Sequence, residues 1–129
     1  MKLKAIKPLQ YVCFFPTEFS TKQDGDLYVY LALDIYSQKL FNLGVFKDNQ
    51  PLTVLKHIEL LMNDKDFKLH RDKGFTLILH KYKSVEPQIN TIIAPYKGKV
   101  IFNDAYIVDN MMPAIENIFK YISNKNKPK

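Results

Sequence analysis

This sequence has one cysteine, no tryptophan and four glycines among its 129 residues. The single Cys13 excludes a disulfide framework or a cysteine-rich zinc site within one chain, and it is typical of a protein from a reducing compartment. No apolar run reaches the length of a signal peptide or of a membrane span, so we expect a cytoplasmic protein with no membrane partner. The three histidines, His57, His70 and His80, do not have the spacing of a zinc site.

The composition predicts one globular domain. Hydrophobic residues make up 47% of the chain, and nine Phe and eight Tyr suit a sheet with a well-filled interior. The net charge is +6 and the pI is about 9.3, which permits an anionic partner such as nucleic acid but does not demand one. We expect the domain to occupy residues 1–123 and residues 124–129 to form a disordered basic tail.

The first half of the chain predicts three antiparallel strands. Residues 10–15 are apolar and aromatic, and Asp24-Gly25 is a typical hairpin turn. Residues 27–36 form the strongest strand pattern, because they are apolar on both faces, and residues 40–46 return beside them. An amphipathic helix is predicted after Pro51, and its apolar face is formed by Val54, Ile58, Leu61 and Met62.

The second half is harder to assign. Residues 67–70 are predicted to form the fourth strand, and residues 89–94 a short fifth one. Residues 75–85 fit either a helix or a strand, and residues 100–108 are apolar without a clear pattern. A last helix is expected to begin at Asp109 or Asn110, with Pro113 in its first turn. The sequence therefore predicts an α/β fold: a five-stranded mixed sheet whose first three strands are antiparallel, flanked by helices.

A charged stretch, His70-Arg71-Asp72-Lys73-Gly74, follows the predicted fourth strand. A carboxylate at the end of a strand lies where ligand sites of α/β sheets are built, although an Asp before a Gly is also an ordinary turn. The stretch imitates the catalytic loop of protein kinases, but Leu77 stands where that loop requires Asn. Asp72 is therefore the first candidate for chemistry.

Three carboxylates are expected to converge if strands one and four are neighbours and the last helix packs beside them: Glu18, Asp72 and Glu116. Clustered carboxylates repel one another unless cations bind them, and oxygen ligands suit Mg²⁺ or Mn²⁺. Two such ions support phosphoryl transfer by activating a nucleophile and holding the leaving oxygen. Each residue alone has a simpler interpretation, since an early helix Glu also favours the helix dipole.

Four blocks in order resemble the catalytic core of DDE transposases and retroviral-type integrases, which has an RNase H-like fold, most closely the transposases of bacterial insertion sequences. The blocks are residues 25–39, similar to "G-x-LYLA…LDLFSRK", 70–74, similar to "HSDxG", 89–98, similar to "GI…S…KG", and 109–119, similar to "DNAPIENFF". The resemblance implies a bacterial protein whose residues 1–123 form an integrase- or transposase-like core.

The resemblance also implies an activity, which is metal-dependent polynucleotidyl transfer on DNA with two Mg²⁺ or Mn²⁺ ions. It makes Asp72 and Glu116 the second and third catalytic carboxylates and metal ligands, with Glu18 in the place of the first, where the family has Asp. The stretch from Asp72 to Glu116 is longer than the family's usual spacing, and Asp109, which would restore that spacing, is a rival third ligand.

Two functions remain open at this point. One is an active DNA transposase or integrase core; the other is a catalytically lapsed core that serves as a DNA-binding or oligomerisation module, such as a homodimer. The helical recognition domain that usually precedes the core is expected to be missing or supplied by a separate chain. The lysines expected to contact DNA phosphates are Lys73, Lys81, Lys83, Lys97 and Lys99.

Overall fold

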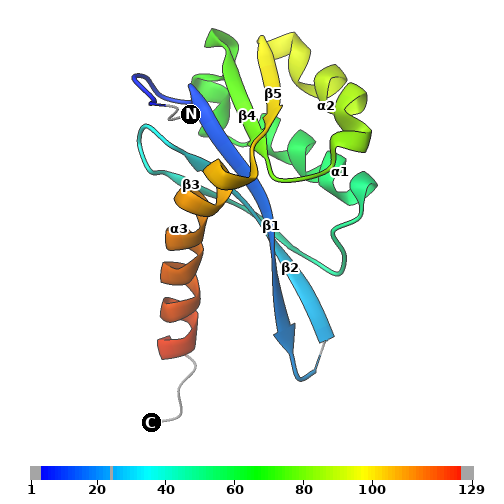
Figure 1. Ribbon diagram of the computed structural model, residues 1–129, viewed down its shortest axis with the longest axis vertical. Coiled ribbons are helices and arrows are strands. Elements are labelled where there is room, and N and C mark those ends of the chain that lie inside the picture. The colour runs from blue at the N-terminus through cyan, green and yellow to red at the C-terminus, as the bar shows by residue number, and fades with distance from the viewer. Residues whose placement is uncertain (1–3, 24, 126–129) are drawn as a thin grey trace.

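A mixed sheet of five strands lies at the centre of the structure, a computed structural model that describes residues 4–23 and 25–125, with side chains as far as residue 117. The strands are β1 (Tyr11–Thr21), β2 (Gly25–Asp34), β3 (Leu40–Phe46), β4 (Phe75–Leu79) and β5 (Gly98–Phe102), in the spatial order β3-β2-β1-β4-β5 (Figure 1). The first three are antiparallel neighbours, whereas β4 runs parallel to β1 and β5 parallel to β4. The predicted fold class is confirmed.

Helices cover both faces of this sheet. α1 (Pro51–Met62) and α2 (Glu86–Ile93) pack on one face, and α3 (Asp104–Lys125) packs on the other (Figure 1). Successive side chains of a strand point to opposite faces, so Leu77 of β4 lies in the α1–α2 core and Ile78 in the α3 core. Both side chains are fully buried, as expected for a parallel strand covered on two sides.

Residues 67–70 do not form the predicted fourth strand. They belong to a 3₁₀ turn, Phe67–Leu69, that a second turn, Arg71–Lys73, follows. A strand would place Phe67 and Leu69 on one face, but Phe67 is fully buried and Leu69 is 71% exposed. The fourth strand is β4, whose pattern was ambiguous because it is apolar on both faces.

The predicted fifth strand, at residues 89–94, is also wrong. Most of this stretch is α2, in which Ile89 and Ile93 lie one turn apart and are both fully buried, and Pro87 occupies the first turn. The fifth strand is β5, which begins at Gly98.

The last helix begins earlier than its sequence signals indicate. α3 starts at Asp104 rather than at Asp109 or Asn110, and Pro113 lies inside the helix rather than in its first turn. The helix continues to Lys125, so it includes the first two residues of the predicted tail, and residues 126–129 lie outside the described residues. No helix of the described ranges is long and apolar enough to cross a membrane.

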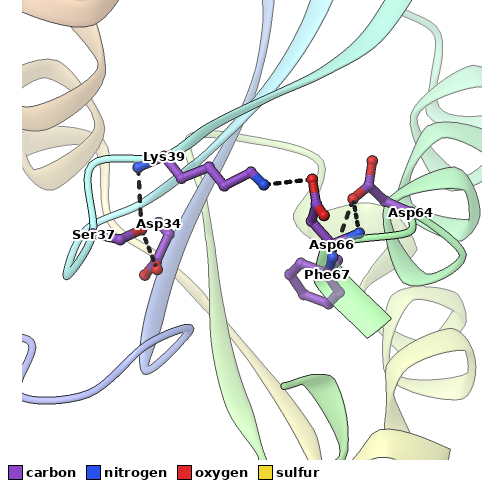
Figure 2. A network of polar contacts seen from close by, with 6 residues as sticks. All are labelled: Asp34, Ser37, Lys39, Asp64, Asp66 and Phe67. Atoms are coloured by element: carbon purple, nitrogen blue, oxygen red, sulfur yellow. Dashed lines mark hydrogen bonds and ion pairs between the residues drawn. The ribbon is translucent and has the colours of Figure 1, made fainter. Parts of the chain in front are cut away.

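Asp34 organises the turn between β2 and β3. Its carboxylate, on a residue only 2% exposed, accepts a hydrogen bond from the Ser37 hydroxyl at 2.7 Å (Figure 2). It also accepts a hydrogen bond from the Leu9 backbone N–H at 3.1 Å. Residues 33–39, the second part of the first block that carries the family resemblance, therefore have a structural role in this chain: they close a turn and fix the segment that leads into β1.

Lys39 extends this network to the turn before β4. Its Nζ pairs with the Asp66 carboxylate, while Asp64 accepts hydrogen bonds from the backbone N–H groups of Asp66 and Phe67 (Figure 2). The hydrogen bond from Lys39 lowers the pKa of Asp66 below its usual range. The network ties the β2–β3 turn to the segment that buries Phe67.

Candidate functional site

Three elements meet where β4 ends and α3 begins, beside the middle of β1. His80 follows β4 directly, and Asp104 is the first residue of α3. On β1, Cys13 is the partner of Ile78, so Phe15 lies level with His80 at this edge of the sheet. This is the arrangement of strand one, strand four and last helix that the sequence predicted, but other residues occupy it.

The side chains at this edge are Phe15, His80 and Asp104, which we call the His80 cluster. His80 Nδ1 donates a hydrogen bond to Asp104 Oδ1 at 3.1 Å, and the imidazole lies edge to face with the Phe15 ring, with 5.8 Å between ring centroids. The imidazole is 36% exposed and the carboxylate 69%. The His80–Asp104 pair joins the end of β4 to the start of α3, and the Phe15 ring of β1 packs against its imidazole.

Glu18 and Asp72 lie toward opposite ends of the neighbouring strands β1 and β4. Glu18 is exposed on β1, opposite Tyr28 of β2. Asp72 lies in the turn before β4, where Tyr11 is the partner of Thr76, and β1 advances about 23 Å from Tyr11 to Glu18 at about 3.3 Å per residue. The structure does not bring these two carboxylates together, because Asp72 precedes β4 instead of ending it.

Asp72 is held close to its neighbour in the sequence. Its carboxylate is 76% exposed and lies 3.8 Å from the Arg71 guanidinium. This is the geometry of a solvated turn residue, the simpler interpretation that the sequence left open.

Glu116 and its rival Asp109 are exposed on α3. About 18 Å of helix separates Glu116 from Asp104, at about 1.5 Å per residue. Asp104 is therefore the carboxylate that α3 brings to the edge of β4. The sequence pattern did not indicate the His80 cluster, because the helix was expected to begin at Asp109 or Asn110. Asp104 was the available signal, since an Asp is favoured in the first turn of a helix.

The donor set at this edge does not fit a pair of Mg²⁺ or Mn²⁺ ions. Those ions prefer several oxygen ligands, whereas the His80 cluster supplies one carboxylate, one imidazole and a phenyl ring. Within the described part of the chain, no three His, Cys, Asp or Glu side chains lie close enough together to hold a metal ion. The convergence of Glu18, Asp72 and Glu116 is thus not found.

The five lysines predicted to contact DNA fall into two groups. Lys81 and Lys83 follow β4, next to His80. Lys73, Lys97 and Lys99 lie at the other end of β4 and β5, where they line a cavity together with Lys7. We call the cavity lined by Lys7, Lys73, Lys97 and Lys99 the lysine pocket.

The fold and the meeting of β1, β4 and α3 define a chain with the architecture of an integrase catalytic core. No family model matches the sequence, and no curated protein matches it. Among solved structures, the HTLV-2 integrase catalytic core domain in complex with magnesium is similar in both its trimeric and its dimeric form, with a TM-score of 0.66 and 12% identity over 97% of this chain and 80% of that chain.

A second similar structure is the simian T-cell lymphotropic virus intasome in complex with the PP2A regulatory subunit B56 gamma. Its TM-score is 0.63 at 10% identity, over 97% of this chain and 46% of the matched chain. Likeness at this level of identity establishes the shared fold of retroviral integrase cores. The closer similarity to bacterial insertion-sequence transposases stays a prediction.

Proposed function

We propose that this chain is a DNA-binding module built on the fold of an integrase catalytic core, and that it does not itself carry out metal-dependent polynucleotidyl transfer. The observation that supports this proposal is the His80 cluster. Two-metal phosphoryl transfer needs several carboxylate oxygens around ions about 3.5–4 Å apart. Where β1, β4 and α3 meet, Asp104 is joined by an imidazole and a phenyl ring instead.

DNA is the proposed partner because of the fold and the charge. The similar structures named above are an integrase catalytic core and an intasome, and the chain carries a net charge of +6. The five predicted lysines are exposed and lie near the two opposite ends of β4. Lysine contacts to phosphates carry no sequence information, so binding is sequence-tolerant, and recognition of a particular sequence falls to a separate domain or chain.

A second function, the active transposase or integrase core, keeps one point in its favour: a structure with the same fold is in complex with magnesium. In that hypothesis Glu18, Asp72 and Glu116 hold two Mg²⁺ or Mn²⁺ ions. It requires a rearrangement that carries Asp72 from one end of β4 to the other, a displacement of at least about 13 Å for a strand of five residues.

We also propose a homodimer. The HTLV-2 core is described in dimeric and trimeric forms, and β3, an edge strand of this sheet, exposes Val45 (53%) and Phe46 (39%). Exposed apolar residues on an edge strand favour pairing with another chain. Light scattering of the purified protein would give the mass of a dimer, and a monomeric mass at high concentration would remove this part of the proposal.

One pair of assays tests the main proposal. Short DNA duplexes of unrelated sequence should bind with similar affinity, and the affinity should fall steeply with salt, by about one unit of log–log slope for each phosphate contact. A supercoiled plasmid should stay uncut with Mg²⁺ or Mn²⁺. Metal-dependent nicking that Asp72→Asn abolishes would establish the enzyme instead, and the absence of binding at low salt would remove DNA as the partner.

A further inference from the structure

The lysine pocket lies at the end of the sheet where β4 and β5 begin, opposite to the end that carries the His80 cluster. Its volume is about 310 Å³, and its four lysines come from separate segments: Lys7 precedes β1, Lys73 ends a turn before β4, and Lys97 and Lys99 flank Gly98 at the start of β5. This end is the upper one in Figure 1, where the starts of β1, β4 and β5 lie together. The pocket therefore brings cations that are distant in the sequence around one space.

Among the residues that the structure describes, none of those lining this pocket is acidic. Within residues 4–23 and 25–125, none of its four lysines forms an ion pair, and the neighbouring Asp72 is paired with Arg71. Ammonium groups around one cavity repel one another, and an anion in the cavity relieves that repulsion. The charge of the pocket is thus suited to an anionic ligand.

The segments that carry these lysines are fixed to one another. The Arg71 guanidinium lies over the Tyr96 ring at 4.0 Å, which joins the turn before β4 to the turn before β5. Gly98 packs so closely against Phe75 that a Cβ there would come within 2.6 Å of the Phe75 ring. The pocket is consequently formed before any ligand binds, which reduces the ordering that binding would require.

The backbone at the mouth of the pocket is also specialised. Lys97 has a φ of 60°, in the left-handed region that lysine rarely adopts. Gly74, with a φ of 89°, lies against Lys97, since a Cβ on Gly74 would come within 3.4 Å of the Lys97 carbonyl oxygen. The left-handed turn directs the chain from Lys97 into β5 beside Gly74. Because Gly74 has no side chain, it leaves space in the pocket that it lines.

We propose that the lysine pocket binds a phosphate monoester, and that in DNA this group is the 5′-phosphate at the end of a strand. The assignment to a DNA end rests on the proposed DNA-binding function, whereas the binding of a phosphate monoester does not. A phosphate monoester carries a charge of about −1.5 to −2 at pH 7 and three acceptor oxygens, which suits a small cavity that several lysines line. Binding along a DNA backbone would spread the cations along a groove, whereas these four line one cavity at the small end of ligand-site volumes.

The experiment compares two oligonucleotides that differ only in a 5′-phosphate or a 5′-hydroxyl. The phosphorylated strand should bind about tenfold more tightly, because hydrogen bonds between charged groups are the strongest class. Adenosine monophosphate should compete with it, because it carries the same group. If the mononucleotide alone binds as tightly as the phosphorylated strand, the ligand is a free nucleotide and the DNA-end assignment is wrong.

Two double variants with equal charge provide the control. Lys73→Ala/Lys99→Ala should remove the preference for the 5′-phosphate, whereas Lys81→Ala/Lys83→Ala should weaken both oligonucleotides equally and leave the preference intact. All four lysines are exposed, so melting temperatures should stay unchanged. Equal affinity for the two ends, with no competition by the nucleotide, would overturn this inference and leave DNA binding standing. Binding of the nucleotide without binding of DNA would support the phosphate site in the lysine pocket and would remove the proposed DNA-binding function.

Discussion

Gly98→Ala should destabilise the protein through a steric clash where β5 begins, between the new methyl group and the side chains of Phe75 and Ile93. The added Cβ would lie 2.6 Å from Phe75 Cζ and 2.8 Å from Ile93 Cβ, closer than carbon atoms approach in folded proteins. Neither neighbour can move into solvent, because Phe75 is 4% exposed and Ile93 is fully buried. Overpacking of this kind costs about 1–3 kcal/mol, and we expect about 2 kcal/mol here.

The assay is thermal and urea unfolding of the purified variant. For a domain of this size, about 2 kcal/mol corresponds to a fall of about 6 to 10 °C in Tm. Phe75→Leu should lower stability by itself, but in the Gly98→Ala background it should cost less, because the smaller side chain leaves space for the new methyl group. A Tm within about 1 °C of wild type, or additive effects of the two changes, would refute the steric argument.

Three other outcomes test separate parts of the structure. Lys39→Met removes the hydrogen bond that lowers the pKa of Asp66. The stability from this pair is present at neutral pH and is lost below about pH 4, so the free energies of unfolding of wild type and variant should converge in acid. A difference in stability that persists in acid would contradict the pairing. Burial raises the pKa of the Cys13 thiol to about 12, so a thiol reagent should label it only after unfolding, and rapid labelling of the native protein would contradict its burial. Phe15→Asp/His80→Asp adds two carboxylates beside the first residue of α3, so Mn²⁺ should raise the Tm of this variant, and no response would show that the three positions do not converge.

The order of strands and the layers were predictable where each element has its own pattern. The central strand at residues 27–36 and the helix after Pro51 lie within a few residues of β2 and α1, because hydrophobic periodicity and Pro placement act locally. The fourth strand was not predictable in this way. A strand buried on both faces has no alternation, and the apolar pair Phe67 and Leu69 imitated one by chance.

The site was less predictable than the fold because it depends on contacts between distant residues. The motif around Asp72 resembles a catalytic block, but its role depends on which end of β4 it occupies. Because the fourth strand was predicted before Asp72 rather than after it, Asp72 was expected at the wrong end of the strand. The His80–Asp104 pair depends on where β4 ends and α3 begins, and neither boundary has a strong local signal. The lysine pocket likewise joins Lys7 to segments that only the parallel pairing brings near it.

Metal binding by the wild-type protein is the measurement that tests the central claim most directly. Isothermal titration with Mn²⁺, with and without DNA, should show no saturable site, and the Tm should be the same with and without the metal, because the carboxylates of β1, the β4 region and α3 lie too far apart to share an ion. A saturable Mn²⁺ site that Asp72→Asn or Glu18→Gln removes would contradict the account and would restore the metal-dependent enzyme.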